Sequence, residues 1–158
     1  MALYTSRYSY WGLKHFEGAI IPISRSLPKL AVEYDMKETI KELAPAYKLM
    51  KIQDRQEFTA AYIKQLEALG YERIKRLIND RARGNSDAVL LCFEDVYKPG
   101  LYCHRTILAD WLNQYAENKV YEIEQPPIAE EATVTNQTTE PEKPKGEQIG
   151  FMVPNVAL

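Results

Sequence analysis

The 158-residue sequence contains only two cysteines and two histidines, and no apolar run approaches the roughly 20 residues that a membrane-spanning helix needs. The first residues, MALYTSRYSYWGLKHF, lack the basic start and the continuous apolar stretch of an export signal. We therefore expect a cytoplasmic protein with no membrane partner. Its cysteines should be thiols or ligands, because disulfides form mainly in oxidising compartments.

A strong net charge is also absent, since 20 Lys and Arg oppose 22 Asp and Glu. Residues 1–124 carry 18 basic and 17 acidic side chains, whereas residues 125–158 carry 2 lysines and 5 glutamates. The chain thus has no overall field that would attract nucleic acid, and any basic binding surface must be local.

The composition changes near residue 124. Residues 1–124 have the mixture expected of one globular domain, whereas residues 125–148 are rich in Pro, Glu and Thr and predict a disordered acidic linker. Residues 149–158 become apolar again, and two interpretations stay open for them. They are an ordinary chain end, or a peptide that docks on this domain or on a protein partner. Its anchoring side chains would be Phe151, Met152, Val153 and Leu158.

Strand and helix patterns alternate through the first 124 residues. Short apolar or β-branched runs predict strands at residues 2–8, 18–24, 87–94 and 120–124. Helical spacing of apolar residues predicts helices at residues 35–44, 55–69 and 71–83, with another around residues 107–115. This order predicts an α/β domain with a mostly parallel sheet flanked by helices.

Two of the predicted helices begin with a capping-box pattern. Asp35 is followed three residues later by Glu38, and Asp54 is followed in the same way by Glu57. Gly70 is a plausible end of the second of these helices.

Polar side chains follow three of the predicted strands. Ligands of parallel sheets usually bind beyond the carboxyl ends of the strands. The loop of residues 95–102 then leads to a helix start, where backbone N–H groups favour anions. The candidate site residues at this edge are Arg7, Arg25, Lys29, Cys92, Glu94, Cys103, His104 and Arg105.

The segments LLCFE and CHRTILADWL, separated by a short loop, resemble the hallmark of the bacterial and phage domain-of-unknown-function family numbered 488. YTSRY, IIPISRSLPK, KELAPAYKL and FTAAYIKQL resemble other family segments in the same order, so that the resemblance runs from about Tyr4 to Leu112. Many members carry an acidic residue where this chain has Ser24, directly before Arg25. The resemblance implies a fold and a site, but no particular reaction.

A zinc site is one interpretation of this site. Cys92, Cys103 and His104 would supply three ligands and leave a fourth position for water. However, the adjacent residues Cys103 and His104 would both have to point at one ion, and there is no Cys-x-x-Cys pair. We therefore predict no metal ligand set.

Thiol chemistry is a second interpretation. Cys103 lies beside His104 and Arg105 at a predicted helix start, which is the kind of place that lowers a thiol pKa. Cys103 would then be the nucleophile and His104 its base, with Glu94 as general acid or base.

An anion pocket is the leading interpretation. Arg7, Arg25, Lys29 and Arg105 would hold a phosphate-bearing nucleotide or a nucleic-acid end, with Cys92 at the wall, and the domain would bind or process that ligand. A structural alternative also stays open. Cys92 would then be a core residue and Glu94 would pair with Arg105, while the protein acts as an adaptor through its surface and its last residues. The sequence alone does not decide whether the chain is an enzyme, nor which cofactor it uses.

Overall fold

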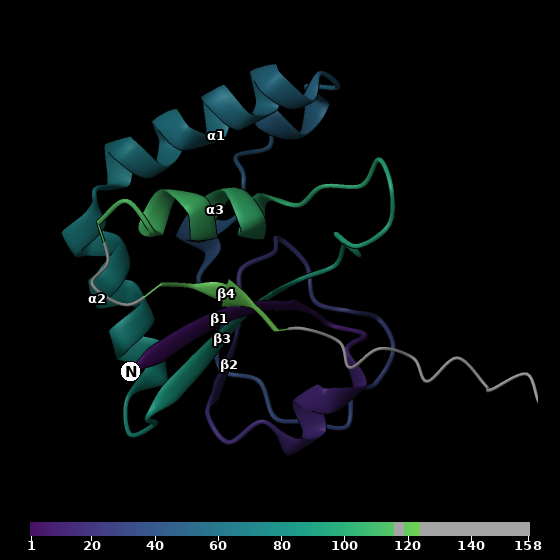
Figure 1. Ribbon diagram of the computed structural model, residues 1–158, viewed down its shortest axis with the longest axis vertical. Helices are drawn as coiled ribbons and strands as arrows, with labels where there is room; N and C mark the ends of the chain where they lie inside the picture. Colours follow the sequence, from purple (N-terminus) through teal and green to yellow (C-terminus); the bar gives the residue numbers. More distant parts are fainter. Residues whose placement is uncertain (116–118, 124–158) are drawn as a thin grey trace, which may run out of the picture. The chain divides into compact units, whose positions relative to one another are not determined.

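Four parallel strands form one sheet in the computed structural model, which describes residues 1–115 and 119–123 (Figure 1). The order across the sheet is β2-β3-β1-β4. Arg7 lies opposite Cys92 and Pro22 lies opposite Leu91, so β1, β2 and β3 end at one edge. The predicted parallel α/β fold is confirmed, including the strand that closes the sheet. The strands are β1 (Ala2–Arg7), β2 (Ala19–Pro22), β3 (Asp87–Cys92) and β4 (Tyr121–Glu122).

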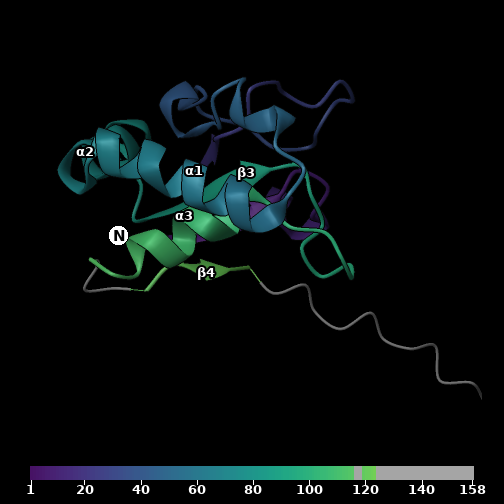
Figure 2. The same ribbon diagram turned by 90° about the horizontal axis from the view of Figure 1, so that it is seen from above.

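Three helices cover one face of the sheet, namely α1 (Arg55–Leu69), α2 (Tyr71–Ala82) and α3 (His104–Leu112) (Figures 1 and 2). Successive strand residues point to opposite faces. Ala88 and Leu90 of β3 accordingly join the helix-side core. Val89 and Leu91 join a smaller core on the other face, which Leu13 of the short helix η1 (Trp11–His15) and Tyr34 help to cover.

The ends of α1 follow from its sequence. The Asp54 carboxylate accepts a hydrogen bond of 2.8 Å from the Glu57 N–H, as the capping pattern predicts. Gly70 has a φ of +80°, and its N–H bonds to the Leu66 carbonyl 2.9 Å away, which ends the helix. Phe58, Tyr62 and Leu66 are the buried face of α1.

The prediction of a helix at residues 35–44 is wrong. Only η2 (Lys41–Leu43) is helical there, as a single 3₁₀ turn, and a further turn, η3 (Leu49–Lys51), follows it. The Lys37 N–H donates to the Ile20 carbonyl at 2.7 Å, and the Ile40 N–H donates to the Pro22 carbonyl at 3.0 Å. Because β2 lies at the edge of the sheet, its outer carbonyls need partners, and this segment provides them instead of forming a helix.

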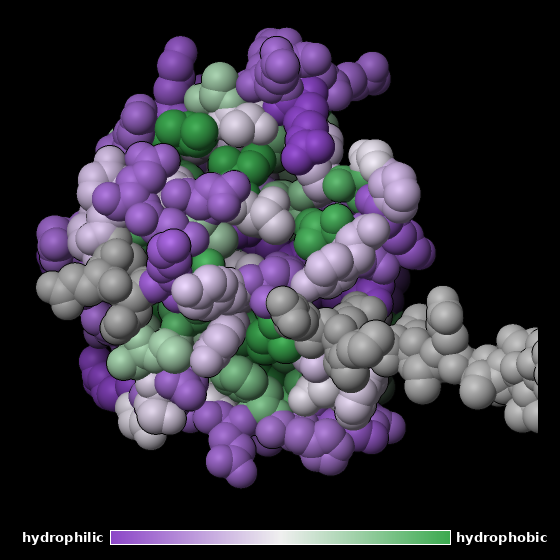
Figure 3. All heavy atoms as spheres, in the orientation of Figure 1, coloured by the Kyte–Doolittle hydropathy of each residue, from purple (hydrophilic) through white to green (hydrophobic). Residues whose placement is uncertain are grey.

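The described elements all belong to the unit Met1–Pro126. Hydrophilic side chains surround smaller apolar areas on the face of it shown in Figure 3. None of the helices in the described part is long and apolar enough to cross a membrane. The predicted linker (125–148) and the apolar peptide with Phe151, Met152, Val153 and Leu158 lie outside the described residues.

Candidate functional site

The carboxyl end of β3 brings four of the predicted site residues together. Cys92 is the last residue of β3, and Glu94 follows two positions later on the helix-facing side. The chain then loops out and returns at the start of α3, where Cys103 is the N-cap residue and His104 the first helical residue. Both thiols are buried, with 3% and 2% of the residue exposed, whereas Glu94 is exposed.

One carboxylate oxygen contacts both thiols. The Cys103 thiol donates to Glu94 Oε2 at 2.8 Å, and the Cys92 thiol lies 3.3 Å from the same oxygen. The proton between Cys103 and Glu94 can belong to either group, because the sulfur and the carboxyl oxygen are both ionisable.

His104 faces the same two sulfurs. Its Nε2 lies 3.0 Å from the Ile23 carbonyl oxygen, which can only accept a hydrogen bond, so Nε2 carries the proton. In the neutral ring Nδ1 then has a free lone pair, and it lies 3.6 Å from Cys92 Sγ and 3.8 Å from Cys103 Sγ. The objection that Cys103 and His104 cannot point at one place therefore does not hold in this structure.

The surroundings shift the pKa values of this cluster apart. Burial opposes ionisation of Cys103, but the hydrogen bond from Cys92 and the nearby Arg105 guanidinium lower the pKa of the Cys103 thiol well below its ordinary value. The hydrogen bond to Cys103 and burial raise the pKa of Cys92. Burial, together with Cys103, raises the pKa of Glu94. The cluster thus favours one thiolate, Cys103, over two.

Arg105 is held by the protein itself. It is fully buried, and its guanidinium donates from Nε and NH2 to the Glu122 carboxylate at 2.8 to 3.3 Å, and from NH1 to the Glu94 carbonyl at 2.7 Å. The same carboxylate accepts from the Thr5 hydroxyl at 2.7 Å. Arg105 therefore supports the backbone of Glu94 and fastens β4 to α3.

The other three predicted cations make no hydrogen bond to a thiol in the described part of the chain, although Arg7 lies opposite Cys92 in the sheet. Arg7 forms an ion pair with Asp95. Arg25 donates from Nε to the Pro45 carbonyl at 2.5 Å, and its guanidinium lies 4.3 Å above the Tyr47 ring. Lys29 lines a separate cavity. Ligand binding by these residues, and by Cys92 and Arg105, stays a prediction.

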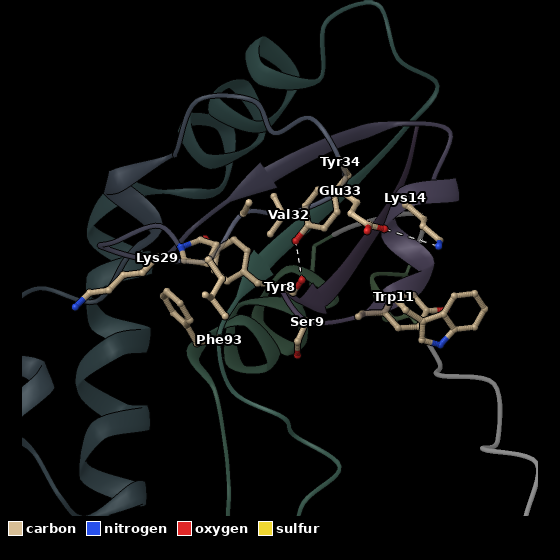
Figure 4. Close-up of a pocket in the computed structure, with 13 residues that line it drawn as sticks. Tyr8, Ser9, Trp11, Lys14, Lys29, Val32, Glu33, Tyr34 and Phe93 are labelled. Atoms are coloured by element: carbon tan, nitrogen blue, oxygen red, sulfur yellow. Dashed lines mark hydrogen bonds and ion pairs between the residues drawn. The ribbon is translucent and has the colours of Figure 1, made fainter.

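That cavity has a volume of about 490 Å³ and lies on the face of the sheet opposite to the helices (Figure 4). Phe93, which points away from Cys92 and Glu94, forms part of its wall and contacts the Tyr8 ring at 4.8 Å between centroids. Its other side chains are mainly aromatic, apolar or basic. They include Tyr10, Trp11, Lys14, Lys29 and Tyr34.

Tyr8 links the cavity to the carboxyl edge. Its ring lines the cavity, and its hydroxyl lies 2.7 Å from Ser24 Oγ. The Ser24 hydroxyl donates its own proton to the Ser26 carbonyl 2.6 Å away. In the bond between Tyr8 and Ser24, the Tyr8 hydroxyl is therefore the donor. Burial raises the pKa of Tyr8 to about 12, which keeps the hydroxyl protonated.

Tyr8 and Glu122 were absent from the predicted site. The position of Tyr8 just beyond β1 was a usable signal, because it shares the edge with Arg7. Glu122 gave no comparable signal, since its strand has only two residues and pairs with β1 through long-range contacts.

A family model named DUF488-N3a, described as the active DUF488-N3 subclade, matches residues 4–116. The match includes every site residue described above except Glu122. Neither the curated proteins nor the solved structures gave a match.

Proposed function

The chain belongs to the DUF488 family, within the subclade described as active, and from this premise we propose that it is an enzyme acting on a phosphate-bearing nucleotide or nucleic-acid end. The predicted resemblance to this family is thereby confirmed. The reaction would take place at the carboxyl end of β3, with Glu94 as the acid–base group.

The position of the Glu94 carboxyl group carries the proposal. A general acid or base must reach both the substrate and a proton partner. Glu94 is exposed, while its Oε2 lies 2.8 Å from a buried thiol and its backbone carbonyl is fixed by Arg105. The Glu94 carboxyl group is thus exposed to a substrate while a buried proton partner lies beside it.

The neighbouring cavity supports a nucleotide as the ligand. Its aromatic rings offer stacking surfaces for a base, and stacking of this kind tolerates any base. Lys29 is exposed and makes no hydrogen bond or ion pair with any other described residue, so its ammonium group is free to bind a phosphate. The other lysine at the cavity, Lys14, is already paired, because its Nζ lies 3.8 Å from Glu33 Oε2 (Figure 4).

The cavity and the carboxyl group lie on opposite faces of the sheet, but adjacent residues at the end of β3 connect them. Phe93 lines the cavity, and Glu94 is the next residue along the chain. A ligand that stacks in the cavity and extends over the end of β3 would bring its reacting bond to Glu94.

Binding can be followed through Trp11, which is 61% exposed at the cavity, whereas Trp111 is buried. The probes are nucleoside 5′-mono-, di- and triphosphates and 5′-phosphorylated single-stranded oligonucleotides. We expect at least one probe to quench the fluorescence saturably, and Lys29→Ala to weaken its binding about tenfold through loss of a charge-assisted contact. Lys64→Ala removes an equal charge from the exposed side of α1 and should bind normally. If no probe saturates, or if Lys29→Ala binds as the native protein does, this ligand class is wrong.

Turnover of the bound probe is measured by chromatography and mass spectrometry. Glu94→Gln keeps the shape of the side chain, and we expect it to bind the probe but to turn it over at least about 100-fold more slowly. Glu67→Gln, an exposed change on α1, is the matched control. A native protein that binds a probe but leaves it unchanged would contradict an enzymatic function.

A further inference from the structure

Three donor atoms of the kinds that bind zinc converge at the end of β3. Cys92 Sγ, Cys103 Sγ and His104 Nδ1 all lie within 4.8 Å of one another, and all three residues are buried. Cys92 comes from a strand and the other two from the start of a helix, so the fold itself brings the donors together.

The spacing of these atoms fits a tetrahedral zinc ion. Bond lengths of about 2.3 Å to sulfur and about 2.0 Å to nitrogen, at tetrahedral angles, place sulfur and nitrogen about 3.6 Å apart. The two distances from His104 Nδ1 to sulfur are 3.6 and 3.8 Å. Both nitrogen–sulfur distances are therefore close to those of a tetrahedral site, and the third distance, between the two sulfurs, is under 4.8 Å.

His104 is already oriented as a metal ligand. A ligating histidine usually donates its other ring N–H to a carbonyl or carboxylate, which fixes the tautomer. Here Nε2–H donates to the Ile23 carbonyl at 3.0 Å, and the ring packs against Tyr62 with centroids 5.5 Å apart. These two contacts direct the Nδ1 lone pair toward the sulfurs.

Charge also favours a divalent cation. Arg105 forms an ion pair with Glu122, so its single positive charge cannot also balance two buried thiolates. A buried charge without a partner is unfavourable, whereas two thiolates and one Zn²⁺ have no net charge. Thiolate and imidazole donors suit zinc better than magnesium or calcium.

We propose that Cys92, Cys103 and His104 hold a zinc ion, and that the fourth position, on the side of Glu94, is occupied by water. Three protein ligands with an open position are the arrangement of catalytic zinc sites, where the ion makes bound water more acidic. Glu94 Oε2, which contacts both sulfurs, lies where it would accept a hydrogen bond from that water.

The site does not depend on the nucleotide ligand, because no residue of the cavity is a zinc ligand. Glu94 is not required for zinc binding either. The metal site and the proposed function can therefore fail separately.

The first test is the metal content of the full-length protein, expressed with zinc in the medium and purified without chelator. Elemental mass spectrometry should find about one zinc per chain. His104→Ala and Cys92→Ser should each lose most of the metal, while Glu94→Gln keeps it. His15→Ala, which changes the other, exposed histidine, is the matched control.

The second test needs no variant, so it remains valid if the ligand variants fold poorly. Zinc is removed from the native protein under reducing conditions, the free thiols are confirmed by mass, and cobalt(II) is added. We expect thiolate-to-cobalt charge-transfer absorption and the intense visible bands of tetrahedral cobalt, both reversed by zinc. With zinc bound, alkylation of the two thiols should be slow until a chelator is added.

A protein purified without metal that develops no charge-transfer band on adding cobalt to its reduced thiols would overturn the proposal. A purified native protein whose mass is lower by two hydrogens would also overturn it, because its thiols would then be a disulfide and not ligands. Full zinc content in His104→Ala would show that the metal lies elsewhere.

Discussion

The guanidinium of Arg105 and the carboxylate of Glu122 form a bidentate ion pair beneath the candidate site, with NH2 2.8 Å and Nε 3.1 Å from the two oxygens. The Arg105 side chain is fully buried, and that of Glu122 is 17% exposed. The remaining nitrogen, NH1, holds the Glu94 carbonyl. A pair that looks structural thus also positions the exposed carboxyl group.

Glu122→Gln should destabilise the domain by about 3 kcal/mol, because it leaves the buried Arg105 charge without its partner. The comparison is urea unfolding of the native protein and the variant. Glu67→Gln, which makes the same chemical change on the exposed side of α1, should change the unfolding free energy by less than about 0.5 kcal/mol. Equal stability of the two variants would mean that the ion pair contributes little.

The Asp54 cap should stabilise α1 measurably. Asp54→Ala removes the only side-chain acceptor at the helix start that the structure shows for the Glu57 N–H, and we expect a loss of about 1 kcal/mol in thermal or urea unfolding. Asp54→Asn keeps an oxygen acceptor and should remain close to the native protein. If alanine and asparagine behave alike, the hydrogen bond is not what matters at this position.

The buried hydroxyl of Tyr34 should make the free energy of unfolding decrease at alkaline pH. Burial raises the pKa of Tyr34 from 10.0 to about 12, and its hydroxyl donates to the Tyr8 carbonyl at 2.7 Å. The folded state therefore keeps this proton at pH values where the unfolded chain loses it. The contribution of Tyr34 is complete below pH 10 and declines as the pH rises toward 12.

The measurement is urea unfolding of the native protein and of Tyr34→Phe at several pH values. At pH 8 the variant should be less stable by about 1 kcal/mol, the usual contribution of one hydrogen bond. The difference in unfolding free energy between the native protein and Tyr34→Phe should become smaller above pH 10. A difference that stays constant with pH would show that the Tyr34 hydroxyl ionises equally easily in the folded and unfolded chains.

Local signals were enough to predict most of the fold. The apolar residues of β2 and β3 have no polar interruption, and the Asp54 and Gly70 signals for α1 depend only on their immediate neighbours. The placement of Cys92, Glu94 and the Cys103–His104 segment at one edge could also be predicted, because ligand sites of parallel sheets lie where strands end and the next helices begin.

Other contacts could not be predicted because their partners are distant or their geometry is unusual. Arg105 was assigned to an anion, but its partner lies 17 residues away in the shortest strand. Cys103 and His104 converge because Cys103 is extended, with φ −138° and ψ 147°, while His104 begins the helix. Two successive helical residues would diverge by about 100°.

The segment that replaced the predicted helix at residues 35–44 gives a last prediction, on backbone exchange. Its capping pattern favours a helix locally, but two amides bond to the outer carbonyls of β2 instead. If this pairing holds in solution, the amides of Lys37 and Ile40 should exchange with deuterium more slowly than those of Glu38 and Thr39, for which the structure shows no acceptor in its described part.

Nuclear magnetic resonance can resolve these four amides one by one, and a helix would give a different pattern. Helical N–H groups bond four residues back, so protection would then begin at Thr39, run through Lys41 and leave Lys37 unprotected. Slow exchange at Lys37 and Ile40 alone would show that the exposed edge of a parallel sheet can override a helix-capping signal. Continuous protection from residue 39 onward would mean that the local signal prevails.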